Sequence, residues 1–176
     1  MTRPLPRAPS TPHYGNDRAL SRVYAWKERA VIDDVYNGRI LDLASRTPAP
    51  GSLDGADASV TKVSKLCGSQ LRADIAMDGD RVRDIAMEVK ACALGQAAAT
   101  VVYENAVGAT ATEISSACAT MHAMLKENGP PPDGRFGELK YLEPVKDYRA
   151  RHASTLLAID ALAEAVERAT ERAAAA

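Results

Sequence analysis

The chain has 176 residues, and its 22 lysines and arginines against 23 aspartates and glutamates give a net charge of −1. This length allows one domain with a substantial core, and the balanced charge lacks the basic excess typical of nucleic-acid-binding proteins. No apolar stretch approaches the roughly 20 residues that span a bilayer, and the N-terminal residues lack the apolar segment of a secretory signal. We therefore expect a cytoplasmic protein that binds neither nucleic acid nor a membrane.

The N-terminal part of the chain is rich in proline. Residues 1–18 contain four prolines and few apolar side chains, so we expect a disordered tail followed by a single domain over residues 19–172. Apolar spacing over residues 20–44 predicts one helix interrupted near Asn37-Gly38, or two short helices. Residues 46–57, rich in Pro, Gly and Asp, are expected to form a loop.

Three strands are predicted next. Residues 58–66 are strand-like with imperfect alternation, which allows a bulge. Cys67-Gly68-Ser69 is typical of a hairpin turn, and residues 71–77 alternate as a half-buried strand does. After a second turn at Asp78-Gly79-Asp80, residues 81–89 form the third strand. The pattern predicts a three-stranded antiparallel meander.

Helices follow the strands. We expect helices over residues 92–107 and 112–128, with Gly129 and three prolines ending the second. Residues 136–145 are predicted to be a short irregular or helical connection. Residues 147–153 lead into a last helix that ends near Arg172. Strands first and helices after indicate an α+β fold, with helices packed on one face of the sheet.

Two of the three cysteines are expected at the same end of the meander. Cys67 is in the first turn, and Cys92 is where the strand period changes to a helical one. A helix N-terminus favours a thiolate, and Lys90 could favour it further. The alternatives are two buried structural cysteines and a lysine that, with Glu88, is an ordinary solvated strand residue. An odd cysteine count in a cytosol-like sequence argues against a disulfide framework.

Two histidines are candidates for metal binding. His152 is predicted near the start of the last helix, where the neutral imidazole that binds metal is favoured; alternatively it is an exposed residue beside Arg149 and Arg151. We interpret Cys67, Cys92 and His152 as one site. Cys118 and His122 can share a helix face, but two ligands are too few, so we expect Cys118 to pack in the core.

Four segments together resemble the NifU/IscU/SufU-type iron–sulfur cluster assembly scaffolds. They are Tyr36-Asn37-Gly38-Arg39-Ile40-Leu41, similar to the start of that domain; Leu66-Cys67-Gly68-Ser69, similar to its Cys-Gly-Asp motif; Lys90-Ala91-Cys92-Ala93-Leu94-Gly95-Gln96-Ala97, similar to its second cysteine motif; and Arg149-Ala150-Arg151-His152-Ala153-Ser154-Thr155-Leu156-Leu157, similar to its third. The resemblance covers residues 33–166. The long connection over residues 129–151 is closer to the SufU-type subgroup.

The resemblance implies a SufE/IscU-like α+β fold with a metal or cluster site at Cys67, Cys92 and His152. It implies a carrier, not an enzyme, that binds iron, a [2Fe–2S] cluster or zinc. The implied partners are a cysteine desulfurase, apo-protein acceptors and a chaperone of the Hsp70 type, because Pro144-Val145-Lys146 is similar to a segment that such a chaperone binds.

Two positions depart from the family pattern. Ser69 replaces the family's aspartate, and Ala153 replaces its third cysteine. A [2Fe–2S] cluster and tetrahedral zinc each take four ligands, whereas this chain supplies three. Water, glutathione, a partner's thiol or a second copy of the chain in a homodimer could complete the site. Ser69 and Lys90 are further candidates at its edge.

Three hypotheses follow. The first is a scaffold or sulfur acceptor. The second is a metal-binding or adapter protein of the same fold that has lost cluster assembly, suggested by Ala153 and Ser69. The third is a zinc-activated hydrolase with an open coordination position, which ranks last because no acid or base is visibly placed beside the three ligands.

Overall fold

The computed structural model describes residues 37–175. The predicted tail of residues 1–18 and the part of the predicted first helix before Asn37 lie outside the described residues. Helix α2 (Gly38–Ser45) begins where the interruption was predicted. Asn37 caps it, because its side-chain oxygen accepts hydrogen bonds of 3.1 Å from the backbone N–H groups of Arg39 and Ile40.

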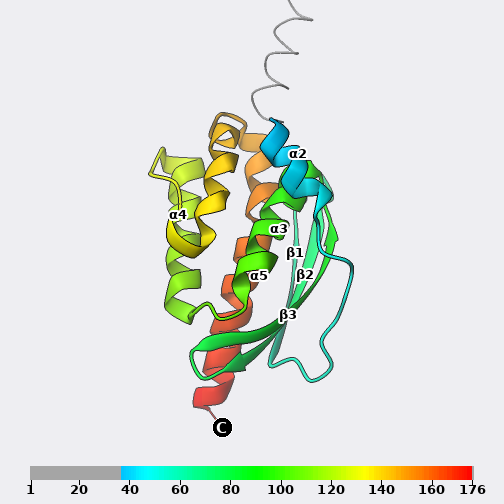
Figure 1. Ribbon diagram of the computed structural model, residues 1–176, viewed down its shortest axis with the longest axis vertical. Helices are drawn as coiled ribbons and strands as arrows, with labels where there is room; N and C mark the ends of the chain where they lie inside the picture. Colours follow the sequence, from blue (N-terminus) through cyan, green and yellow to red (C-terminus); the bar gives the residue numbers. More distant parts are fainter. Residues whose placement is uncertain (1–36, 176) are drawn as a thin grey trace, which may run out of the picture. The chain divides into compact units, whose positions relative to one another are not determined.

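Within the described residues, strands β1 (Ala58–Val63), β2 (Gln70–Asp78) and β3 (Arg81–Lys90) form one antiparallel sheet in the order β1-β2-β3 (Figure 1). The predicted meander is therefore confirmed. The imperfect alternation of the first strand does not reflect a bulge, because the β1–β2 register runs without interruption. A register shift occurs instead between Ala76 and Met77, where β2 pairs with β3.

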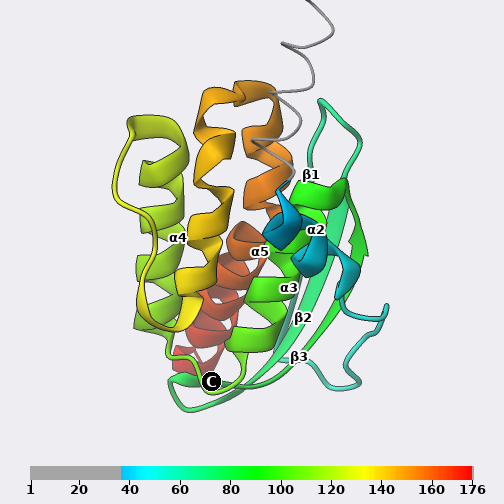
Figure 2. The ribbon, with the colours of Figure 1, turned by 45° about the horizontal axis from the view of Figure 1, so that its top comes forward.

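Four helical segments follow the sheet: α3 (Ala93–Ala106), α4 (Ala111–Glu127), η1 (Gly134–Asp147), which is a run of 3₁₀ turns, and α5 (Arg149–Ala174). Helix α5 packs against β1 and β2, and α3 packs against β3. Helix α4 and η1 lie outside them, so the helices cover one face of the sheet (Figures 1 and 2). The α+β fold with helices on one face is confirmed. None of the helices that the structure describes is long and apolar enough to cross a membrane.

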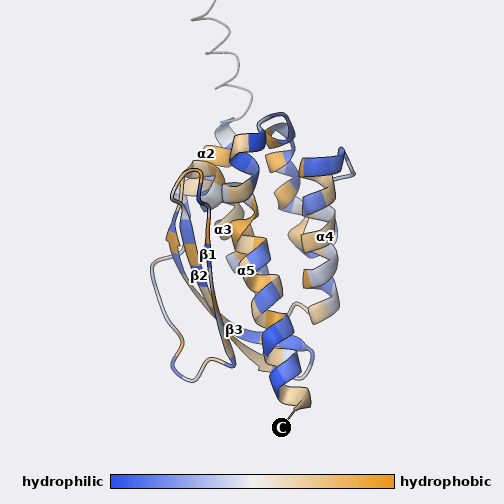
Figure 3. Cartoon of the chain, turned by 180° about the vertical axis from the view of Figure 1, so that it is seen from behind, coloured by the Kyte–Doolittle hydropathy of each residue, from blue (hydrophilic) through white to orange (hydrophobic). Residues whose placement is uncertain are grey.

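The core lies between the sheet and the inner helices. Leu71, Ile75 and Met87 on the sheet are almost fully buried against the apolar sides of α3 and α5, which include Leu94 and Ile159. Figure 3 shows the corresponding pattern on α5, where hydrophobic and hydrophilic residues alternate along the helix.

Helix α4 has well-defined ends. Its capping residue Thr110 accepts a hydrogen bond from the backbone of Glu113, whose carboxylate accepts one from the backbone N–H of Thr110 in return. At the other end Asn128 has a left-handed backbone (φ 54°), which ends the helix just before Gly129, as predicted.

The loop of residues 46–57 packs along the sheet. The Gly51 backbone N–H donates to the carbonyl of Met87 at 3.0 Å, and the Leu53 N–H donates to the carboxylate of Asp74 at 3.3 Å. Asp74 points away from the helices and is nevertheless 1% exposed. The loop therefore shields part of the face that the helices leave uncovered.

The register fixes which ends of the elements meet. Val63 pairs with Gln70, and Gln70 pairs with Lys90 on the next strand. The loop between β1 and β2 therefore lies at the same end of the sheet as the exit of β3. Figure 2 shows that the starts of α3 and α5 lie at this end too.

Candidate functional site

The β1–β2 loop presents Cys67 at its exposed tip. Inside the loop, the Ser64 N–H donates to the carbonyl of Ser69 at 2.8 Å, and the Gly68 N–H donates to the carbonyl of Ser64 at 2.9 Å. Gly68 has a φ of +71°, a conformation that glycine adopts without strain. These bonds close the loop and hold the Cys67 side chain over two buried serines.

Those serines surround the Cys67 sulfur. The Sγ atom lies 3.2 Å from the Ser64 hydroxyl and 3.1 Å from the Ser69 hydroxyl. Hydrogen bonds from Ser64, then from the hydroxyl and the backbone N–H of Ser69, lower the pKa of the Cys67 thiol from 9.0 to about 7, because they favour the charged form. Cys67 is therefore an exposed thiol with substantial thiolate character at neutral pH.

Cys92 lies at the N-terminus of α3, as predicted. It is the residue that precedes Ala93, with extended backbone angles (φ −67°, ψ 168°), and its carbonyl accepts the helical hydrogen bond from Gln96 at 2.9 Å. Its half-buried sulfur lies 3.7 Å from the hydroxyl of Ser154, a buried residue in the second turn of α5. The sulfur thus lies where the N-termini of two helices meet.

Gly95 makes this meeting possible. A Cβ atom on Gly95 would lie 2.8 Å from the Cβ of Ala91 and 3.0 Å from the carbonyl oxygen of Ser154. The first distance is shorter than real Cβ contacts and the second is tighter than most of them, so the glycine lets α3 approach the backbone of α5 closely. This close approach sets the distance between Cys92 and Ser154.

The two thiols share one open hollow. It has a volume of about 350 Å³ and is lined by Cys67, Gly68, Ser69, Lys90, Ala91, Cys92 and Arg151. The Ser154 hydroxyl, which lies beside Cys92, also contributes to lowering the pKa of Cys67. The structure therefore brings together four of the five predicted site residues: both cysteines, Ser69 and Lys90.

Sequence reasoning missed three residues of this site, one in the lining of the hollow and two next to the sulfurs. Ser64 and Ser154 carry hydroxyls next to the sulfurs, and Arg151 adds a second cation to the lining, which already contains Lys90. Lys90 pairs with Glu88 at 2.7 Å; the Lys90 side chain is largely exposed and that of Glu88 is half-buried. Serines carry no distinctive sequence signal, so only the fold reveals them.

His152 does not line this hollow. The residue is 8% exposed, and Nε2 of its ring lies 3.1 Å from the carbonyl oxygen of Val145 and 3.0 Å from that of Lys146. Those carbonyls belong to the last turn of η1, which packs next to the start of α5. His152 as a metal ligand beside the two thiols therefore stays a prediction, one that requires its ring to leave these carbonyls. His152 and the neighbouring Ala153 both line a second hollow, which is separate from the one that holds the two thiols.

Cys118 and His122 share a face of α4, as predicted. A carboxylate from α5, that of Asp160, lies next to both of them, which the sequence did not indicate. The prediction that Cys118 simply packs in the core is incomplete, because its half-buried sulfur lies 3.5 Å from a carboxylate oxygen of Asp160 on α5. Burial, followed by the Asp160 charge, raises the pKa of the Cys118 thiol to about 12. The same Asp160 oxygen lies 2.7 Å from Nε2 of His122.

Comparison with known proteins agrees with this geometry. The model of the family described as NifU-like N terminal domain matches residues 35–174. The crystal structure of a nitrogen-fixing NifU-like protein (N-terminal) from Brucella abortus is 51% identical, covers 81% of this chain and 99% of its own, and has a TM-score of 0.79.

Two curated relatives carry the name iron-sulfur cluster assembly scaffold protein IscU. The one from Thermotoga maritima is 28% identical over 141 residues, which is 78% of this chain and 96% of the relative. The one from Streptococcus pyogenes serotype M1 is 25% identical over 137 residues, which is 78% of this chain and 86% of the relative.

Proposed function

Because the chain belongs to the NifU-like N-terminal domain family, we propose that it is an iron–sulfur cluster assembly scaffold or sulfur acceptor that works through Cys67 and Cys92. The observation that carries this proposal is the shared open hollow of the two thiols, at an end of the fold where a donor protein can reach them. Relatives from Thermotoga maritima and Streptococcus pyogenes are named as scaffolds of this kind.

Cys67 is the residue suited to accept sulfur. Its lowered pKa supplies thiolate at neutral pH, and a thiolate is the nucleophile that attacks a sulfur–sulfur bond. In the proposed step the Cys67 thiolate attacks the outer sulfur of a persulfide on a donor cysteine. The bond between the donor's two sulfurs breaks, the donor leaves as a thiolate, and Cys67 becomes the persulfide, with no net oxidation. The proposed donor is a cysteine desulfurase.

The two sulfurs supply part of a cluster or zinc site. Iron in a [2Fe–2S] cluster and structural zinc both prefer thiolate ligands and take four in all, and the hollow offers two thiols beside the hydroxyls of Ser69 and Ser154. Arg151 and Lys90 also line it, and their positive charge can offset that of thiolates and sulfide. The remaining positions would fall to His152 after its ring turns, to water, glutathione, a partner's thiol or a second copy of the chain.

The alternative is a metal-binding or adapter protein of the same fold that has lost cluster assembly. The observation that favours it is Ala153, which has no donor atom and lines a different hollow from that of the cysteines. In both versions the protein is a carrier, not a catalyst of turnover. Apo-protein acceptors and an Hsp70-type chaperone remain predicted partners, and a cytoplasmic location remains a prediction.

Anaerobic reconstitution with ferrous iron and sulfide tests the scaffold proposal. We expect a coloured protein that contains acid-labile sulfide, with both colour and sulfide lost in Cys67→Ser and Cys92→Ser and retained in a matched Cys118→Ser control. His152→Ala reports whether the imidazole takes part. A colourless parent without sulfide would refute cluster assembly, and a zinc ion that disappears with Cys67→Ser would then support the adapter alternative.

A further inference from the structure

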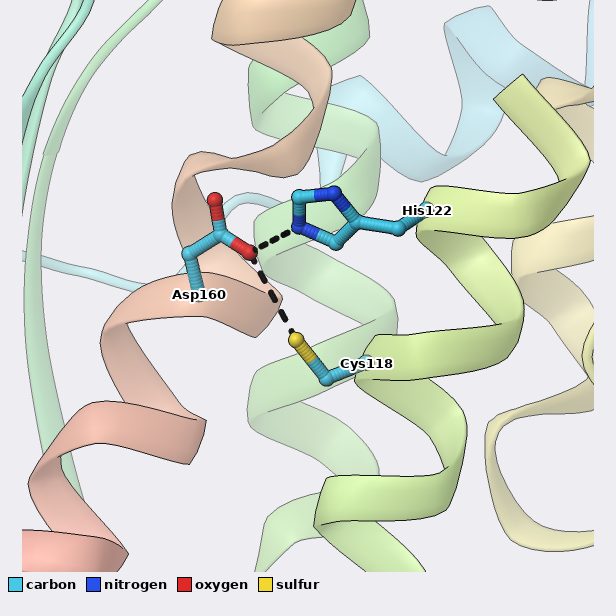
Figure 4. Close-up of side chains that lie close together, drawn as sticks. All are labelled: Cys118, His122 and Asp160. Atoms are coloured by element: carbon cyan, nitrogen blue, oxygen red, sulfur yellow. Dashed lines mark hydrogen bonds and ion pairs between the residues drawn. The ribbon is translucent and has the colours of Figure 1, made fainter. Parts of the chain in front are cut away.

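A second group of potential metal ligands lies between α4 and α5, away from the two thiols just described. Cys118 and His122 are one turn apart on α4, and Asp160 faces them from α5 (Figure 4). Their ligand atoms all lie within 4.8 Å of one another. Among the described residues, no other group of three or more Cys, His, Asp and Glu side chains has this spacing.

We propose that Cys118, His122 and Asp160 form a second metal site, suited to zinc or a zinc-like divalent cation. One sulfur, one imidazole nitrogen and one carboxylate oxygen are a mixed donor set that borderline metals accept. Three protein ligands are the number found in open zinc sites, whose fourth position holds water or another small ligand.

The spacing of the three side chains is close to what zinc requires. Bonds of about 2.3 Å to sulfur and about 2.0 Å to nitrogen or oxygen, at tetrahedral angles, place sulfur and oxygen about 3.5 Å apart and nitrogen and oxygen about 3.3 Å apart. Cys118 Sγ lies 3.5 Å from Asp160 Oδ1. His122 Nε2 lies 2.7 Å from that oxygen, and the ligand atoms of all three side chains lie within 4.8 Å of one another. To hold a metal ion the His122 ring must therefore move away from Asp160 and come to bonding geometry with the Cys118 sulfur.

An open fourth position is available. His122 and Asp160 line a hollow of about 1040 Å³ between α4, α5 and the end of β1. Water that enters this hollow can reach an ion held by the three side chains. Binding through Sγ displaces the thiol proton of Cys118 to solvent, as metal coordination does with cysteine generally.

The position of Lys126 opposes metal binding by His122. Its Nζ lies 3.0 Å from Nδ1 of His122, and an ammonium can only donate there. A ring that binds metal through Nε2 carries its proton on Nδ1, so this hydrogen bond must break. Lys126 is exposed, so its side chain can move into solvent. We therefore expect Lys126→Met to strengthen metal binding, an effect that a purely structural hydrogen-bond network would not produce.

Zinc titration against a chromophoric chelator tests the site. The protein is the full chain with Cys67→Ser and Cys92→Ser, so that the first pair of thiols cannot contribute. We expect one zinc per chain, with affinity reduced by at least about tenfold in Asp160→Asn and in His122→Gln, because loss of an outer partner alone can cost that much. Lys126→Met should bind more tightly than its parent.

Cobalt(II) supplies a second readout. Cobalt bound in the Cys67→Ser, Cys92→Ser background should show thiolate-to-metal absorption that disappears in Cys118→Ser, while zinc should raise the melting temperature of the background protein and not that of Asp160→Asn. A background protein that binds no zinc would overturn the proposal, as would equal affinity in the parent, Asp160→Asn and Lys126→Met. Either result leaves the role of Cys67 and Cys92 untouched.

Discussion

Removing the two serines beside Cys67 should make this thiol behave like an ordinary one. Hydrogen bonds from Ser64, then from Ser69, are the main causes that hold its pKa at about 7 instead of 9.0. A lowered pKa means that thiolate is present above about pH 7 and is lost as the pH falls below that value. In Ser64→Ala/Ser69→Ala we expect the titration midpoint to move up towards 9.0, short of it because the Ser69 backbone N–H remains.

The size of the effect follows from two opposing changes. With a pKa of about 7, roughly half of Cys67 is thiolate at pH 7, whereas with a pKa of 9.0 the fraction is about one in a hundred. The thiolate itself becomes about six to ten times more nucleophilic, because reactivity rises with a Brønsted slope of about 0.4–0.5. The net slowing at pH 7 is therefore at most about fivefold to eightfold, and above pH 9 the variant should react faster than the parent.

The assay is the rate of alkylation of Cys67 by iodoacetamide between pH 5.5 and 10, followed at the Cys67 peptide by mass spectrometry. Ser115→Ala, on an exposed position of α4, is the matched control and should keep the parent's profile. If the double variant keeps the parent's midpoint and its rate at pH 7, the serine hydroxyls do not stabilise the thiolate.

Three further predictions concern packing, capping and charge. Gly95→Ala should lower the free energy of unfolding by about 1–3 kcal/mol in urea, because the new methyl group collides with the Ala91 Cβ and crowds the Ser154 carbonyl; unchanged stability would show that α3 and α5 can separate freely. Thr110→Ala should cost about 1 kcal/mol in the same assay by removing the reciprocal cap with Glu113, and a loss near zero would contradict the cap. Arg151→Glu should slow the reaction of the thiols with a negatively charged disulfide reagent more than with neutral iodoacetamide, and the difference should shrink at high salt; equal slowing of both reagents would argue against an electrostatic role.

The pairing of Cys67 with Cys92 could be predicted because it depends only on strand register. Three alternating segments joined by short turns leave one arrangement, in which the first turn and the exit of β3 lie at the same end. The change of period at Cys92 likewise places the helix N-terminus within one residue of where the structure has it. Both inferences use local patterns that packing does not alter.

The contributions of α5 could not be predicted in the same way. Periodicity shows which side of α5 is apolar, but the exact rotation at its start depends on how closely α3 approaches through Gly95. That rotation directs Ser154 towards the cysteines and His152 towards the carbonyls of η1. Residues 134–147 have no strong helical pattern, so nothing in the sequence indicates that their carbonyls would hold the His152 ring.

The role of Asp160 could not be predicted from the sequence either. The spacing of Cys118 and His122 is visible in the sequence, whereas a third ligand from a different helix appears only when α4 packs against α5. Helix α5 carries several acidic residues, and nothing in the sequence distinguishes Asp160 from them as a metal ligand. The packing of α4 on α5 therefore turns a pair with too few ligands into a candidate metal site.

Helix α5 contributes to both candidate sites, yet the two sites are independent in their ligands. Ser154 and Asp160 lie about 9 Å apart along the helix axis and about a third of a turn apart around it. They therefore face different neighbours, Cys92 on α3 and His122 on α4. Because no side chain serves both, iron and sulfide retained by Cys67 and Cys92 can be measured separately from zinc retained between α4 and α5. A reconstituted protein that contains both would show that one helix anchors two metal-binding surfaces, and loss of zinc through Asp160→Asn should leave the labile sulfide content unchanged.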